Sequence, residues 1–239
     1  MIRERDQKYR NRRNMKTKEL LQILQDPENI YRGKPFWAWN GELDIVELKR
    51  QIDVMKDMGF GGFFMHSRTG LNTEYLGEHW FACVRACAEY AYSLGMEAWL
   101  YDEDRWPSGT AGGLATKKER NRLHFISLYD DDTDFPVLAR FAYKSTKDYF
   151  PVNKKAEVPN GYAYQVYVSE VMENNSFYNG YTYLDTMNPE AVRDFFELTH
   201  EQYKKHMGDL FGKEIKGIFT DEPHRGALFT GFGINNVNG

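Results

Sequence analysis

Two regular patterns of apolar and polar residues alternate along most of the chain. The continuously apolar segment at residues 62–65 predicts a strand that is buried on both faces, and residues 97–101 predict another strand. Apolar residues recur at helical spacing over residues 45–58, before the first of these segments, and over residues 78–94, between the two. A glycine follows each run. Strands that alternate with helices in this way are typical of βαβ units and predict a parallel sheet.

The pattern begins with an apolar segment at residues 35–39 and returns near the end of the chain. Asp44 and Glu47 have the spacing of a capping box and predict a helix start. Asn188, followed by proline, predicts the start of one long helix with a buried stripe that reaches Leu210. A fourth strand is expected over residues 216–220.

Residues 116–182 interrupt this order with alternating segments and turn residues, which predict a β-rich insertion after the third strand. No glycine-rich phosphate loop follows the first strand, which disfavours a doubly wound sheet. We therefore expect an α/β fold that is the first half of a (β/α)8 TIM-type barrel, with about four βα units and an incomplete barrel. The predicted domains are a basic N-terminal arm and short helix (1–29), a partial catalytic barrel (30–115 and 183–239) and the insertion (116–182).

Composition and charge narrow the class of protein. The 239 residues carry 31 basic and 35 acidic side chains, and this balance argues against nucleic acid as a partner outside the basic arm, residues 1–14. No apolar run approaches the roughly 20 residues of a membrane helix, so no membrane partner is expected. Cys83 and Cys87 lie four apart in a predicted helix, where we expect two unpaired core residues and hence a cytoplasmic protein.

Polar and aromatic side chains follow each predicted strand. In parallel α/β sheets the ends of the strands carry the site, and aromatic rings, amides and charges there predict a cleft that binds a polyhydroxylated ligand. Purely structural interpretations stay open. The two tryptophans of the first strand and the histidine could be core residues, and residues 102–104 could form a solvated loop. The candidate ligand-binding residues are Trp37, Trp39, Asn40, His66, Arg68, Asp102, Glu103, Trp106 and Asp221, and Glu222 is the candidate catalytic acid.

Five ordered segments resemble a known family. They are PFWAWNGEL (35–43), GFGGFFMHSRTGL (59–71), YLGEHWF (75–81), GMEAWLYDEDRWPSGTAGG (95–113) and GIFTDEP (217–223). Together they resemble the α-L-rhamnosidase-type glycoside hydrolases of family 106 and their relatives, over about residues 30–239.

The resemblance implies a catalytic (β/α)8 barrel, a carbohydrate substrate, Glu222 as general acid, an inverting mechanism and, in some members, a calcium ion at the sugar. The second catalytic carboxylate of the family lies on a later strand, so we expect it beyond residue 239. The leading hypothesis is a truncated catalytic module that hydrolyses an α-L-rhamnoside or a similar deoxysugar glycoside with carboxylate acid and base chemistry.

Two other hypotheses come from different classes. One is a non-catalytic carbohydrate-binding half-barrel that self-associates through exposed sheet edges. The other is a metal-dependent barrel enzyme with His66, Asp102 and Glu222 as ligands, which the lack of further histidines at strand ends disfavours. Apart from the calcium ion above, we expect no cofactor and no metal site.

Overall fold

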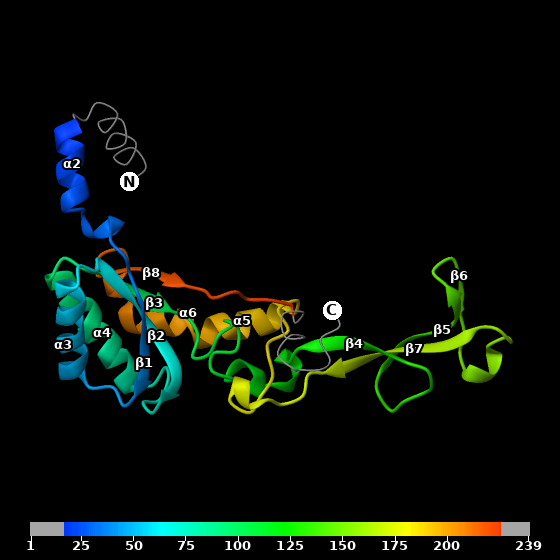
Figure 1. Ribbon diagram of the computed structural model, residues 1–239. Helices are drawn as coiled ribbons and strands as arrows, with labels where there is room; N and C mark the ends of the chain where they lie inside the picture. Colours follow the sequence, from blue (N-terminus) through cyan, green and yellow to red (C-terminus); the bar gives the residue numbers. More distant parts are fainter. Residues whose placement is uncertain (1–16, 226–239) are drawn as a thin grey trace. The chain divides into compact units, whose positions relative to one another are not determined.

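A computed structural model describes residues 17–225 of the chain, which form two compact units (Figure 1). The predicted basic arm, residues 1–14, lies outside the described residues. Within the described part, the first unit contains residues 17–66, 70–101 and 207–219, and the second contains residues 67–69, 102–206 and 220–225.

The first unit is built on an open four-stranded sheet with strand order β1-β2-β3-β8. Its elements are α2 (Thr17–Gln25), β1 (Phe36–Gly41), α3 (Ile45–Asp57), β2 (Gly62–Leu71), α4 (Glu78–Ser93), β3 (Glu97–Tyr101) and β8 (Ile215–Phe219). Strand β3 runs parallel to both β2 and β8. The amides of Phe64 and Asn72 donate to the carbonyls of Pro35 and Gly41, so β1 also runs parallel to β2.

This sheet agrees with the βαβ pattern of the sequence, because neighbouring strands follow one another along the chain. A barrel would need the same order, but four strands in an open sheet do not form one. The half-barrel therefore stays a prediction.

Local sequence signals explain where helix α3 begins and ends. The Asp44 side chain accepts a hydrogen bond from the Glu47 amide at 2.8 Å, as a capping residue should. The reciprocal half of the predicted capping box is absent, since the Glu47 carboxylate binds Arg50 and Gln51 instead. After the helix, Gly59 adopts a φ of +85°, the left-handed conformation that ends helices.

The core of the first unit lies between the sheet and helices α3 and α4, which pack against each other. Cys83 and Cys87 of α4 are free and buried in this core, as predicted. Position 62, at the start of β2, requires glycine for a steric reason. A Cβ atom there would lie 2.1 Å from the Glu97 carbonyl oxygen. Only glycine lets the β2 and β3 backbones approach this closely.

The second unit contains an antiparallel sheet with strand order β4-β7-β5-β6 (Figure 1). Its strands and helices are β4 (His124–Tyr129), β5 (Val137–Ser145), β6 (Asp148–Pro151), β7 (Ala163–Val171), α5 (Pro189–Leu198) and α6 (His200–Met207). All four strands fall within the segment for which alternation predicted a β-rich insertion. The predicted domain boundaries stay predictions.

The long helix predicted after Asn188 is interrupted once. Asn188 caps α5 with its side chain, as predicted. At Thr199, however, the chain leaves helical geometry, with a φ of −113° and a ψ of −79°. The Thr199 hydroxyl donates to the Phe195 carbonyl at 2.7 Å, a back-bond that bends helices. Two shorter helices, α5 and α6, result.

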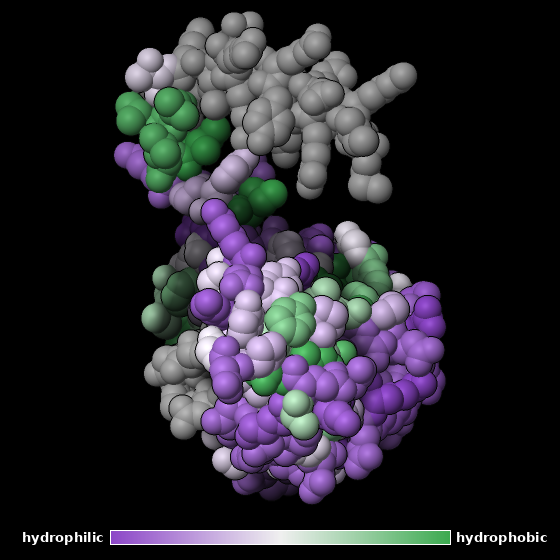
Figure 2. Space-filling model, turned by 90° about the vertical axis from the view of Figure 1, so that its right-hand side faces the viewer, coloured by the Kyte–Doolittle hydropathy of each residue, from purple (hydrophilic) through white to green (hydrophobic). Residues whose placement is uncertain are grey.

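Helix α2 carries an exposed apolar surface, visible in green at the upper left of Figure 2. Its side chains are Leu20, Leu21, Ile23 and Leu24. A surface of this kind on a short helix favours association with another apolar surface. Within residues 17–225, no helix is both long enough and apolar enough to cross a membrane.

Candidate functional site

The loop that follows β3, residues 102–113, folds around the carboxylate of Glu103. One carboxylate oxygen accepts hydrogen bonds from the amides of Gly109, Thr110 and Ala111 at 2.7–3.0 Å. The other accepts from the amides of Asp104 and Gly112. With a longer bond from the Arg105 amide at 3.5 Å, six backbone donors on one buried side chain fix the course of this loop.

Glu103 thus has a place that differs from the predicted one. We expected it to line a cleft, but it is fully buried and both its oxygens are used within its own loop. Burial raises the pKa of Glu103 to about 7, while the N–H donors act in the opposite direction. The role of Glu103 here is to shape the loop.

Asp102 is also fully buried, and it is held by two hydroxyl groups. Ser108 donates to one oxygen at 2.5 Å and Thr220 to the other at 2.6 Å. His200 of α6 lies 3.5 Å from the second oxygen. Burial raises the pKa of Asp102 and lowers that of His200, and in each case the charge of the partner opposes the shift.

Ser108 joins this loop to the segment after β8, residues 220–225. Its amide donates to the Asp221 carbonyl at 2.8 Å, and its hydroxyl oxygen accepts from the Asp221 amide at 2.9 Å. Since the same hydroxyl donates to Asp102, one buried serine connects the two segments. We call this arrangement of Asp102, Ser108, Thr220 and Asp221 the clamp.

The clamp places Glu222 at the surface. Glu222 is exposed and has a φ of +45°, a left-handed conformation that is uncommon outside glycine. The indole N–H of Trp106 donates to its carboxylate at 3.1 Å. Trp106 itself packs on a buried cluster formed by Leu123, Phe125, Met172, Tyr178 and Tyr183.

One further residue of this site, Tyr183, was not predicted from the sequence. Tyr183 is fully buried, its hydroxyl donates to the Ser108 carbonyl at 2.7 Å, and it accepts from the His224 amide at 3.2 Å. The His224 ring stacks on the Tyr183 ring with centroids 4.2 Å apart. Tyr183 therefore supports both sides of the clamp.

The predicted site residues divide between the two units. The second unit brings Asp102, Glu103, Trp106, Asp221 and Glu222 into this one network of contacts. Arg68, also assigned to the second unit, is exposed. The other four candidates, Trp37, Trp39, Asn40 and His66, belong to the first unit.

In the first unit the two tryptophans are core residues, which was the structural alternative to a role in ligand binding. Trp37 and Trp39 are buried and pack edge to face on each other, and Trp39 also packs on Trp80 of α4. The Trp37 indole donates to Gln51 of α3 at 2.8 Å. His66 is buried, with its ring 3.9 Å from that of Tyr101.

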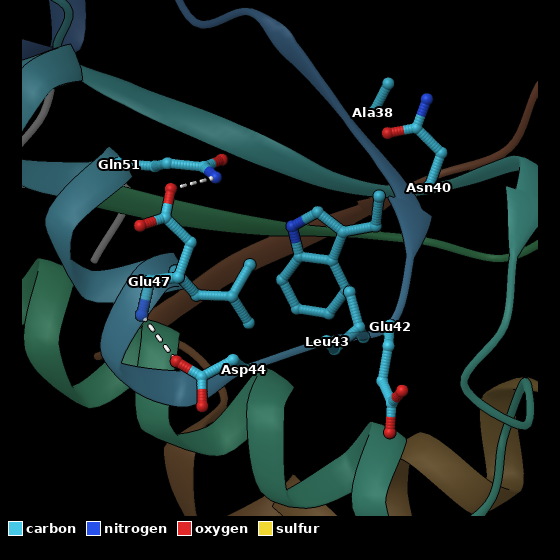
Figure 3. Close-up of a pocket in the computed structure, with 9 residues that line it drawn as sticks. Ala38, Asn40, Glu42, Leu43, Asp44, Glu47 and Gln51 are labelled. Carbon is cyan, nitrogen blue, oxygen red and sulfur yellow. Dashed lines mark hydrogen bonds between the residues drawn. The ribbon is translucent and has the colours of Figure 1, made fainter.

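Asn40 lines a small cavity of about 80 Å³ at the start of α3 (Figure 3). Acidic and amide side chains surround it, among them Glu42, Asp44, Glu47 and Gln51. Hydrogen bonds from Arg50 and Gln51 lower the pKa of Glu47 to about 2. Among the polar groups around this cavity, Gln51 donates to the Glu47 carboxylate and the Asp44 side chain accepts from the Glu47 amide.

A metal site would need several ligating side chains close together. Among residues 17–225, no three His, Cys, Asp or Glu side chains are grouped so that they could hold a metal ion. The calcium ion implied by the family resemblance and the ligand set of His66, Asp102 and Glu222 both stay predictions.

Comparison with known proteins gives a partial likeness to a solved structure. No family model matches the chain, and no curated protein matches it. Part of the chain is similar to the structure of a rhamnosidase from Novosphingobium sp. PP1Y, with 21% identity and a TM-score of 0.35. The match covers 52% of this chain and 12% of the rhamnosidase. At this level of similarity the activity has to be inferred from the chain's own residues.

Proposed function

We propose that this chain is part of the catalytic module of a glycoside hydrolase that acts on an α-L-rhamnoside or a similar deoxysugar glycoside, with Glu222 as general acid. One observation carries the proposal. The Glu222 carboxyl group is exposed at the end of a clamped loop, and an indole N–H holds it at 3.1 Å. A general acid needs this combination of access to the substrate and a fixed position.

The other residues of the site have supporting roles in this proposal. Trp106 orients the carboxyl group of Glu222, and the clamp fixes the backbone on which Glu222 stands. Glu222 gives its proton to the glycosidic oxygen as the bond to the anomeric carbon breaks, so that the leaving group departs as a neutral alcohol. A second carboxylate must activate water for attack on that carbon, and the family resemblance assigns it to a later strand.

Replacement of the acid tests the proposal. Glu222→Gln keeps the size of the side chain but cannot donate a carboxyl proton. In the protein that also carries the strand of the second carboxylate, we expect hydrolysis of alkyl rhamnosides, whose leaving groups need protonation, to fall by about 100-fold or more. Hydrolysis of 4-nitrophenyl α-L-rhamnoside should fall much less, because its leaving group needs little assistance.

The matched control is Glu173→Gln, which changes an exposed glutamate of the same unit and should leave both rates unchanged. Equal losses on both substrates in folded Glu222→Gln, or no loss on either, would remove Glu222 from the role of general acid.

A second candidate function is carbohydrate binding without cleavage. The open four-stranded sheet favours it, since the described strands do not close a barrel. Calorimetry with L-rhamnose tests binding, and turnover of either rhamnoside by the protein that carries the strand of the second carboxylate separates the two candidates. Binding without turnover in that protein indicates a binding module.

A further inference from the structure

The segment between β7 and α5 holds one aromatic side chain at the surface in a fixed position. Asn179 has a φ of +55°, and its side-chain amide donates to Asp104 and to the Gly112 carbonyl, both at 2.9 Å. Asn175 accepts from the Phe177 amide at 2.8 Å through its side chain. These bonds attach the segment to the loop after β3 and leave the backbone at Phe177 little freedom.

Further contacts on each side of Phe177 strengthen this attachment. Tyr178 is fully buried, with its ring 5.7 Å from that of Tyr183. Arg105 donates to the carbonyl of Ser176 at 3.4 Å. The segment is therefore anchored before and after Phe177.

Phe177 packs against Trp106. Its side chain is 39% exposed, and its ring stands perpendicular to that of Trp106, with centroids 6.5 Å apart. The indole N–H of Trp106 holds Glu222. Trp106 thus contacts both the Phe177 ring and the Glu222 carboxyl group, so an exposed apolar ring and the proposed proton donor share one neighbour.

We infer that Phe177 and Trp106 form a platform that binds the leaving group of the glycoside, a ring with an apolar face. The inference rests on the proposed function of Glu222. A general acid protonates the oxygen that joins the sugar to its leaving group, so a ring bonded to that oxygen lies next to the acid. An exposed aromatic ring binds the apolar face of another ring by offset or edge contact. Such a face is present both in aryl groups and in pyranose sugars.

Binding measurements on the chain itself test the platform. The probes are methyl α-L-rhamnoside, which lacks a ring in the leaving group, phenyl α-L-rhamnoside, and a disaccharide with rhamnose linked to a second pyranose. For the unaltered chain we expect the phenyl glycoside to bind about three- to tenfold more tightly than the methyl glycoside. Phe177→Ala should abolish this ratio and leave the affinity for the methyl glycoside unchanged. The disaccharide shows whether a sugar ring gains from the platform as an aryl ring does.

Two control variants accompany this change. Phe150→Ala removes a phenylalanine of nearly equal exposure, 37%, that also has an aromatic neighbour but lies on β6, and it should keep the ratio. Phe177→Tyr retains the ring and should keep the ratio as well. Saturation-transfer NMR on the unaltered chain needs no variant, and it should show the phenyl protons closer to the protein than the methyl protons.

The outcomes separate the two proposals. If both glycosides bind and the ratio is the same in Phe177→Ala as in the unaltered chain, the platform is wrong while the proposed function stands. If neither the methyl nor the phenyl glycoside binds to the unaltered chain, both are wrong.

Discussion

Removal of the Ser108 hydroxyl should weaken the clamp and with it the position of Glu222. The hydroxyl donates to the buried carboxylate of Asp102 at 2.5 Å and accepts from the Asp221 amide at 2.9 Å. Ser108→Ala abolishes both hydrogen bonds. It keeps the backbone bond from the Ser108 amide to the Asp221 carbonyl at 2.8 Å, so the two segments stay in contact.

The expected loss follows from the two bonds. A hydrogen bond to a charged group contributes about 1.5–3 kcal/mol, and a buried N–H without an acceptor costs about 1–3 kcal/mol. Asp102 retains the Thr220 hydroxyl at 2.6 Å, and local relaxation recovers part of the rest. We therefore expect the free energy of unfolding, measured by urea denaturation at neutral pH, to fall by about 3 kcal/mol.

Two further variants make the measurement specific. Thr220→Val removes the other hydroxyl donor to Asp102 but no acceptor of a backbone amide, so its loss should be smaller than that of Ser108→Ala. Ser176→Ala changes an exposed serine of the same unit and should stay within about 0.5 kcal/mol of the unaltered chain. A loss below about 1 kcal/mol for Ser108→Ala, or a larger loss for Thr220→Val, would refute the reasoning about the clamp.

Two other predictions concern stability and association. The Asn121, Lys118 and Arg120 side chains hold the pKa of the nearly buried Asp194 at about 2. Because this value lies below the 3.8 of an unfolded chain, Asp194 stabilises the fold above pH 4. Asp194→Asn should therefore cost about 2 kcal/mol at pH 7 and about half as much at pH 3. In urea denaturation, an equal cost at both pH values would contradict the lowered pKa. The exposed leucines of α2 should promote self-association. Replacement of Leu21 and Leu24 by serine should then lower the sedimentation coefficient at high protein concentration, and no change would contradict this role.

Much of the local structure could be predicted because it depends on neighbours in the sequence. The helix caps at Asp44 and Asn188 bind amides two or three residues away. The strands followed from continuous apolar segments. The interruption at Thr199 was missed, although a β-branched residue with a hydroxyl group was a possible signal. Periodicity alone does not distinguish one helix from two that share a stripe.

The site was harder to predict because its contacts join distant residues. The consecutive acids Asp102, Glu103 and Asp104 look alike in sequence, and only the path of the loop decides that the first two are fully buried. Trp37 and Trp39 share the buried face of β1, whose other face is exposed, but the apolar segment alone does not reveal which face meets the helices. Ser108 and Tyr183 support the site through bonds to Asp221 and His224, and no local pattern marks such residues.

The backbone at Glu222 explains why the chain needs so many buried hydrogen bonds at this place. A residue before proline favours extended conformations, yet Glu222 precedes Pro223 and has a φ of +45°. A left-handed conformation at a non-glycine residue costs about 1–3 kcal/mol and persists only where the surroundings impose it. Hydrogen bonds of the clamp hold Thr220 and Asp221, the two residues before Glu222. After it, the His224 amide donates to the Tyr183 hydroxyl. A solvated surface loop would relax to an unstrained conformation, so the maintained strain favours a functional position for this carboxyl group.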